Sequence, residues 1–101
     1  MMFVSKINYK GDQRVMKNFY FTFGTDDKFP YGINDYVLVQ AHSYTEAVKI
    51  FRKNYPDVHE GIINCAFIYA EDEWNADDMC TKYYSGKSPV CILSRASEVT
   101  D

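Results

Sequence analysis

The sequence predicts an α+β domain: a mostly antiparallel sheet of four to five strands, one main helix at about residues 44–55, and a short second helix at about 71–83. Two kinds of pattern predict this class. Short runs rich in aromatic and β-branched residues are typical of strands, and a single stretch combines helical spacing with a start signal. Turns with glycine, proline and aspartate separate these runs.

Size and composition favour one domain over residues 1–101. The chain has 47% apolar and 25% charged residues, ordinary values for a globular protein, while its 17% aromatic content argues against disorder. No apolar run is long enough to predict a membrane span, which needs about 18 residues. Residues 1–6 lack the pattern of a secretion signal, so we expect a cytoplasmic protein.

Three cysteines at wide spacing, Cys65, Cys80 and Cys91, fit neither a disulfide framework nor a zinc site. His42 and His59 are too scattered to complete a metal site. We therefore expect reduced thiols, no metal and no cofactor, with Cys65 and Cys91 buried as small apolar side chains.

Residues 3–9 and 17–23 alternate as strands do, with a turn between them. Met16-Lys17-Asn18 also resembles a bacterial translation start, so residues 1–15 are interpreted as a possible N-terminal extension. Residues 24–35 contain the glycine, proline and aspartate of a loop. The next strand, residues 36–41, has almost no polar break, which predicts a central position covered on one face by a helix.

The main helix has the clearest local signal. Ser43 and Glu46 have the spacing of a capping box, in which each side chain binds a backbone amide at the helix start. Ala47 and Phe51 then follow at helical spacing. Pro56 predicts the end, because the residue before a proline disfavours helical geometry.

Residues 62–70 predict another central strand, since both of its faces are largely apolar; Ile63, Cys65, Phe67 and Tyr69 share one of them. The acidic stretch from Glu71 begins the second helix. Residues 90–93 form the last strand, and the polar tail, 94–101, is expected to fray.

No catalytic constellation can be identified. Residues 85–88 resemble the end of a phosphate-binding loop but precede Pro89 and a strand, so they are interpreted as a polar turn. The paired carboxylates, as in Asp26-Asp27, are adjacent residues whose side chains diverge, so they are typical of turns and surfaces. No nucleophile, base or acid is fixed near another. We predict that the protein is not an enzyme.

Two groups of residues are candidates for partner binding: rings around the 24–36 loop and an acidic segment with a tryptophan. They are Tyr20, Phe29, Tyr31 and Tyr36, and Glu71, Asp72, Trp74, Asp77 and Asp78. Each group also has a structural interpretation. The rings would be core residues, and the carboxylates would stabilise the N-terminus of a helix. An aromatic strand would suit stacking with nucleic acid, but the net charge of −3 disfavours direct nucleic-acid binding.

Several motifs occur in order along the chain: residues 19–24 (FYFTFG), 29–31 (FPY), 41–47, 55–56 (YP) and 63–66 (INCA) with Tyr69. Over about residues 16–75 this pattern resembles a family of small bacteriophage and prophage proteins to which no activity is assigned. The resemblance implies an accessory protein of the bacterial host cytoplasm, and no catalytic residue is carried over from it.

Two functions follow as hypotheses. The leading one is a non-catalytic inhibitor that binds a host defence protein, such as a CRISPR nuclease, through the 24–36 loop and the acidic segment. The alternative is a sponge for a nucleotide signalling molecule, which would stack the base on Tyr20, Tyr31 or Tyr36. Its phosphates would meet Lys17, Lys28 or Arg52, and a homo-oligomer would hold the ligand at subunit junctions.

Overall fold

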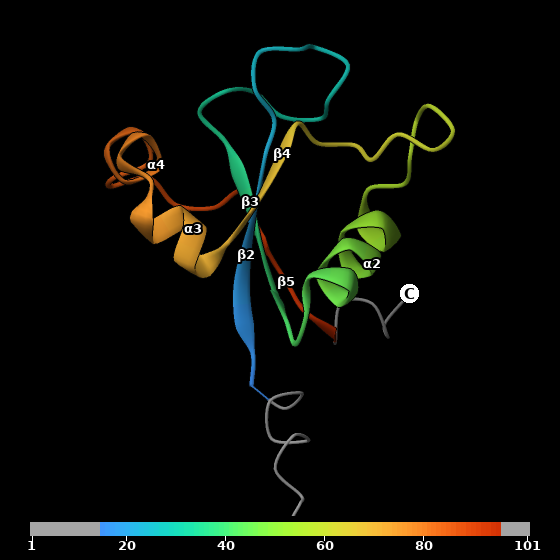
Figure 1. Cartoon of the computed structure of the whole chain (residues 1–101). Helices are drawn as coiled ribbons and strands as arrows, with labels where there is room; N and C mark the ends of the chain where they lie inside the picture. The colour runs from blue at the N-terminus through green and yellow to red at the C-terminus, as the bar shows by residue number, and fades with distance from the viewer. Residues whose placement is uncertain (1–14, 96–101) are drawn as a thin grey trace, which may run out of the picture.

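The computed structural model describes residues 15–95, which form a four-stranded mixed sheet with helices on both sides (Figure 1). The strands are β2 (Lys17–Thr22), β3 (Tyr36–Ala41), β4 (Phe67–Ala70) and β5 (Ile92–Leu93). Their order in the sheet is β4-β2-β3-β5, with β2 antiparallel to both β3 and β4, and β5 parallel to β3. The predicted α+β class is confirmed, and β3 is central as expected.

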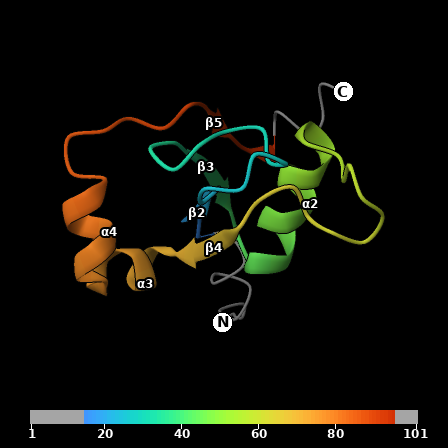
Figure 2. The ribbon, with the colours of Figure 1, turned by 90° about the horizontal axis from the view of Figure 1, so that it is seen from above.

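The main helix, α2 (Tyr44–Asn54), lies on one side of the sheet, and the two short helices α3 (Glu71–Ala76) and α4 (Asp78–Tyr83) lie on the other (Figures 1 and 2). Ser43 Oγ accepts a hydrogen bond from the Glu46 N–H at 3.1 Å, as predicted. Glu46 Oε1 reaches back one residue further than expected and accepts from the His42 N–H at 2.7 Å. The Ser43 bond satisfies an amide in the first turn of α2 that the helix itself leaves unpaired, and the Glu46 bond holds the residue that precedes the N-cap.

Strand alternation divides the aromatic residues between two cores. On the α2 side, Phe21 is fully buried and stacks on Phe51, with ring centroids 4.4 Å apart. Val37, Val39 and Ile50 complete the centre of this core. The opposite side of the sheet holds a smaller core, in which Tyr36, Trp74 and Cys80 are buried together.

The predicted strand 62–70 is wrong in length and position. Only residues 67–70 form β4, and among the described strands β4 is at an edge of the sheet. The Ala66 N–H donates to Thr22 O at 2.8 Å while Phe67 is the register partner of Thr22, so two residues oppose one as in a β-bulge. The bulge reverses the alternation: Ile68 joins Cys65 in the α2 core, and Phe67 points to solvent.

The second helix is also not continuous, because it is interrupted at Asp77. This residue has an extended backbone (φ −87°, ψ 113°) and ends α3. Its side-chain Oδ1 accepts from the N–H groups of Met79 at 2.8 Å and Cys80 at 3.1 Å, so it is the N-cap of α4. The last strand is shorter than predicted, at residues 92–93. The predicted strand 3–9, residues 1–14 of the extension and residues 96–101 of the tail lie outside the described residues.

Candidate contact surface

Two of the predicted anchors lie in the interior. Trp74 is only 9% exposed, and Tyr36 is buried beside it with ring centroids 5.2 Å apart. The prediction that Trp74 binds a partner at the surface is therefore corrected. The reason is that the face of the sheet opposite α2 is itself apolar, and α3 covers it with this indole.

The other predicted rings are half-buried and contribute to packing. Tyr20 stacks on Trp74, while Phe29 and Tyr31 pack against the α2 core. The Tyr31 and Tyr55 hydroxyls share a hydrogen bond of 2.9 Å. These contacts are the ones expected if the rings are core residues.

Three carboxylates of the acidic segment accept hydrogen bonds from backbone amides. Glu73 Oε1 accepts from the Ala70 N–H at 2.8 Å, Glu71 Oε1 accepts from the Asn18 N–H at 3.3 Å, and Asp77 caps α4. Glu71, Asp72, Glu73 and Asp78 remain exposed. The acidic residues therefore lie at the starts of α3 and α4 and also form an acidic surface.

The basic residues proposed for phosphate do not converge. Lys17 begins β2, whereas Lys28 lies beyond its other end and pairs with Asp26 at 3.6 Å. Six strand residues separate the two ends by about 20 Å. Arg52 lies on α2 and pairs with Asp57 at 3.0 Å.

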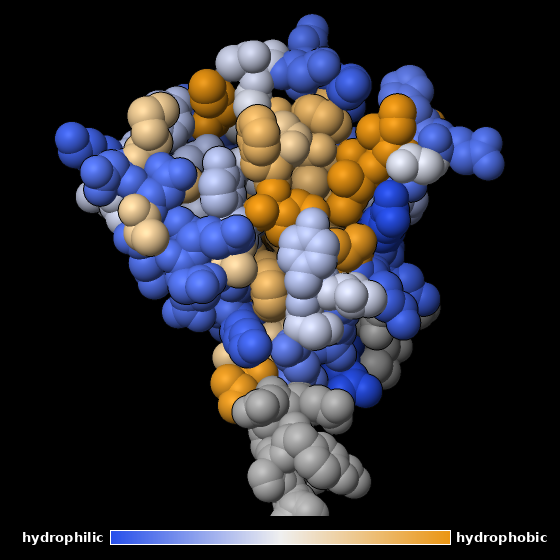
Figure 3. Space-filling view, viewed as in Figure 1, coloured by the Kyte–Doolittle hydropathy of each residue, from blue (hydrophilic) through white to orange (hydrophobic). Residues whose placement is uncertain are grey.

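An exposed apolar surface, which the sequence analysis did not predict, joins the 24–35 loop to α4 and the start of β4. Its centre is a groove of about 250 Å³. Met79 is 77% exposed and Phe67 is 59% exposed at its rim. The groove is lined by Thr22, Gly24, Ile33, Phe67, Tyr69, Met79, Cys80, Tyr83 and Tyr84. We call this the apolar groove. In Figure 3 apolar side chains gather over the middle of the face that carries β4, and hydrophilic ones surround the short helices.

Hydrogen bonds between segments about 50 residues apart hold the apolar groove open. The Tyr83 hydroxyl donates to Asn34 Oδ1 at 2.7 Å, and the Tyr84 hydroxyl donates to Ile33 O at 3.2 Å. Lys87 Nζ donates to the same Asn34 oxygen at 3.3 Å and lies 4.2 Å from the centroid of the Tyr83 ring. The loop and α4 are thus fixed to each other without a partner. Burial raises the pKa of Tyr84 to about 12, so this phenol stays a donor at neutral pH.

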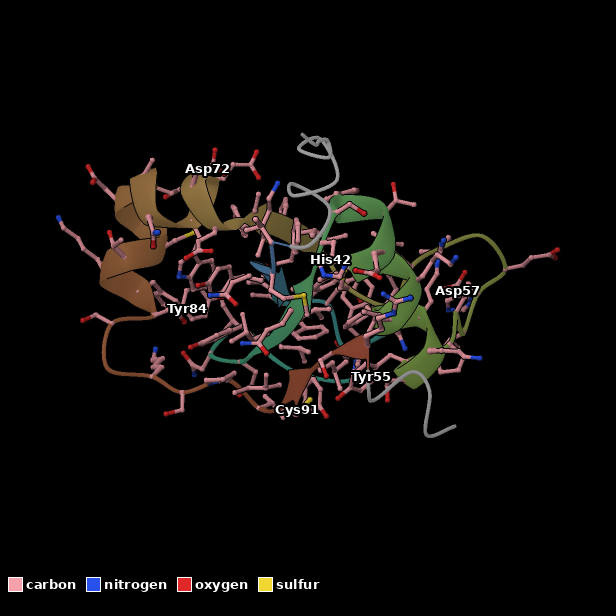
Figure 4. All side chains as sticks on the ribbon, turned by 90° about the horizontal axis from the view of Figure 1, so that it is seen from below. His42, Tyr55, Asp57, Asp72, Tyr84 and Cys91 are labelled. Carbon is pink, nitrogen blue, oxygen red and sulfur yellow. The ribbon has the colours of Figure 1, made fainter. Side chains whose placement is uncertain are left out.

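A second hollow, of about 660 Å³, separates the start of α2 from α3. His42 lies on its α2 side and Asp72 on its α3 side (Figure 4). The His42 Nδ1 lies 3.4 Å from Glu46 Oε1, which already accepts from the His42 N–H. Lys17 and Glu71 also line this hollow, whose groups have mixed charge.

The thiols show no sign of a joint site. Burial raises the pKa of Cys65 to about 12 and also raises the pKa of Cys80, so both are protonated at neutral pH. Cys91 is half-buried rather than buried as predicted, and its Sγ lies 3.3 Å from the Tyr55 hydroxyl (Figure 4). Within residues 15–95 no three His, Cys, Asp or Glu side chains come close enough to hold a metal ion.

The geometry defines a small α+β domain with a preformed apolar groove, and with exposed carboxylates on α3 and at the start of α4. No model of a protein family, no curated protein and no solved structure matches the chain. Across the described part of the chain, no helix has the length and apolar character needed to cross a membrane.

Proposed function

We propose that this chain is a non-catalytic protein-binding module: a phage or prophage accessory protein that binds and inhibits a bacterial defence component, such as a CRISPR nuclease, in the host cytoplasm. The observation that carries the binding role is the exposure of Met79 and Phe67 around the apolar groove. Clustered exposed apolar side chains on a small domain are typical of interaction sites, and methionine and aromatic residues are enriched at interfaces.

The energetics support contact through this surface. Burying a methionine or phenylalanine side chain stabilises a complex by about 1.5–3 kcal/mol. The groove walls are already fixed through Asn34 and Tyr83, so little ordering cost opposes binding.

The choice of target rests on charge and on the phage-type motifs. Glu71, Asp72, Glu73 and Asp78 present exposed carboxylates on α3 and at the start of α4, the helix that forms one wall of the apolar groove. Proteins that handle nucleic acid carry basic surfaces, and an acidic inhibitor complements such a surface. The motifs FYFTFG, FPY and YP supply the resemblance to phage proteins.

The test is capture of a partner by the tagged chain from bacterial lysate, together with a phage-plating assay on a host with an active CRISPR system. We expect one stoichiometric host protein and increased plating. Met79→Lys and Phe67→Lys should each reduce both by at least about tenfold. Val58→Lys is the matched control, because Val58 is 67% exposed but does not line the apolar groove. Capture and plating unchanged by both groove variants would exclude this surface.

The nucleotide sponge receives no support from the described residues. Its stacking rings Tyr20 and Tyr36 contact Trp74 instead, and its basic residues lie apart. We therefore propose the protein-binding role alone.

A further inference from the structure

We infer that the apolar groove receives a tyrosine side chain of the partner, whose phenolic hydroxyl pairs with the buried hydroxyl of Thr22. This inference rests on the proposed function and adds the chemistry of the group that the groove binds. Within residues 15–95, Thr22 is the only buried residue that is not apolar, aromatic or cysteine, and it is 4% exposed. Its hydroxyl has no hydrogen-bond partner in this part of the chain. Buried polar side chains are normally paired, so an unpaired one requires an explanation.

Thr22 lies at the floor of the apolar groove. It follows Tyr20 by two residues on β2, so its side chain points to the side of the sheet that α3 and α4 cover. Thr22 lines the groove although it is almost fully buried, whereas Met79 at the rim is 77% exposed. An occupant therefore passes Met79 first and meets Thr22 with its far end.

The other polar side-chain groups of the groove are already paired within residues 15–95. The hydroxyls of Tyr83 and Tyr84 both donate to the 24–35 loop. The Tyr69 hydroxyl and the Cys80 thiol interact with each other. From its side chains the groove thus offers an occupant one unpaired hydroxyl, at the floor, between aromatic and apolar walls.

This arrangement selects the kind of side chain that fits. A leucine or phenylalanine would cover Thr22 and leave its hydroxyl unpaired, which is unfavourable. A charged group or an amide has more hydrogen-bonding positions than one hydroxyl can satisfy, and burial of the remainder is costly. A tyrosine has an apolar ring with a single hydroxyl at its tip, whereas an indole carries its N–H at the side of the ring. Tyrosine is also enriched among the residues that anchor interfaces.

The size of the groove agrees with one such side chain. Its volume of about 250 Å³ far exceeds the roughly 30 Å³ of one water molecule. It lies below the range of about 300–1,000 Å³ that is typical of pockets for drug-sized ligands. Phe67 and Tyr69 supply rings for edge or offset contacts with the phenol. A single side chain of a partner therefore fits the groove better than a larger free ligand.

The probes for the test are N-acetyl-tyrosine amide and, as its match without the hydroxyl, N-acetyl-phenylalanine amide. Binding is followed by NMR of the carbon-labelled methionine methyl groups, and Met79→Ser identifies the Met79 signal. We expect both probes to shift the Met79 methyl, with the tyrosine probe bound about fivefold more tightly because it alone pairs with Thr22. Thr22→Val replaces the hydroxyl with a methyl group and should reduce this preference to below about twofold. Thr22→Ser retains a hydroxyl and should retain the preference.

Thr81→Val is the matched control, because the Thr81 hydroxyl donates to Asp77 O and does not line the apolar groove. This variant should keep the preference for tyrosine. The denaturant midpoint gives a second readout: Thr22→Val should not lower it, since an unpaired buried hydroxyl contributes nothing to the fold. A lowered midpoint would show that the hydroxyl has a partner within the chain and would overturn the inference.

Three binding results would also overturn it: equal affinity for the two probes, a preference for tyrosine that persists in Thr22→Val, or a Met79 methyl that the tyrosine probe leaves unchanged up to its solubility limit. The first and third need no variant of Thr22, so they apply even if Thr22→Val does not fold. Capture of a host protein that depends on Met79 and Phe67 would still support the proposed function in each case.

Discussion

The indole of Trp74 lies flat on the ring of Tyr20, with centroids 4.1 Å apart and planes inclined by only 4°. Residues from β2 and α3 thereby form the centre of a second core. Tyr84 and Tyr69 approach the same indole with centroids 4.9 Å and 5.7 Å away. The aromatic excess of the sequence is thus divided between two faces of one sheet, and only part of it remains for contact with a partner.

This packing predicts a large loss of stability for Trp74→Ala. Removal of a buried aromatic side chain lowers the free energy of unfolding by about 3–5 kcal/mol, through lost burial and the cavity left behind. Chemical denaturation followed by circular dichroism measures the change. Met79→Ala is the control and should remain within about 0.5 kcal/mol, since its side chain is exposed. A loss below about 1 kcal/mol for Trp74→Ala would contradict the burial described.

Asp77 and Asp78 are neighbours with different roles, so single substitutions should separate them. Asp77→Ala removes the N-cap of α4 and should cost about 1 kcal/mol of stability. Asp78→Ala should be nearly neutral for folding, because Asp78 is exposed in the first turn of α4. Thermal and denaturant unfolding measure both variants. If Asp77→Ala and Asp78→Ala lower the stability equally, the interruption of the helix at Asp77 is contradicted.

At the start of α2, Ser43→Ala should also cost about 1 kcal/mol, because the Glu46 N–H loses its acceptor. Ser43→Asp restores an acceptor and should recover most of the loss. The denaturant midpoints of the two variants provide the measurement. If Ser43→Asp does not recover the stability lost in Ser43→Ala, the N-cap hydrogen bond is not the cause of that loss.

The three thiols should differ in reactivity toward a disulfide reagent at about pH 8. Burial raises the pKa of Cys65 to about 12 and raises that of Cys80, so both stay protonated and shielded. Cys91 is half-buried and should react first. Cys91→Ser should remove the fast phase, and guanidinium should release all three thiols at the unfolded rate. A fast phase that persists in Cys91→Ser would place an accessible thiol elsewhere.

Alkaline pH should destabilise the fold. Burial raises the pKa of Tyr84 from its ordinary value of 10.0 to about 12, so between these values the unfolded chain loses a proton that the folded chain keeps. The part of the free energy of unfolding that depends on Tyr84 is therefore fully present below about pH 10 and falls as pH rises through this window. Denaturant midpoints across the window measure the slope. Tyr84→Phe should reduce the slope without abolishing it, because burial also raises the pKa of Cys65, of Cys80 and of other tyrosines. An unchanged slope would assign the whole effect to those groups.

Local signals in the sequence determined much of this protein. The Ser43 cap and the apolar spacing indicated the start and the buried face of α2. Alternation placed β2 correctly, and an apolar run with almost no polar break placed β3. These signals succeed because they depend on contacts within about four residues, or on the two-residue period of a strand. The turn and loop at residues 24–35 followed from the same kind of local chemistry.

The tertiary structure alone decided which apolar residues are covered. Trp74 is buried because Tyr20, more than 50 positions earlier, lies on the face that α3 covers, and no local pattern encodes that contact. The bulge opposite Thr22 reversed the faces of β4 and exposed Phe67. The Tyr83–Asn34 hydrogen bond joins two distant segments and thereby creates the apolar groove. Burial depends on which elements meet across the sheet, whereas helix and strand formation depends mostly on neighbours in sequence.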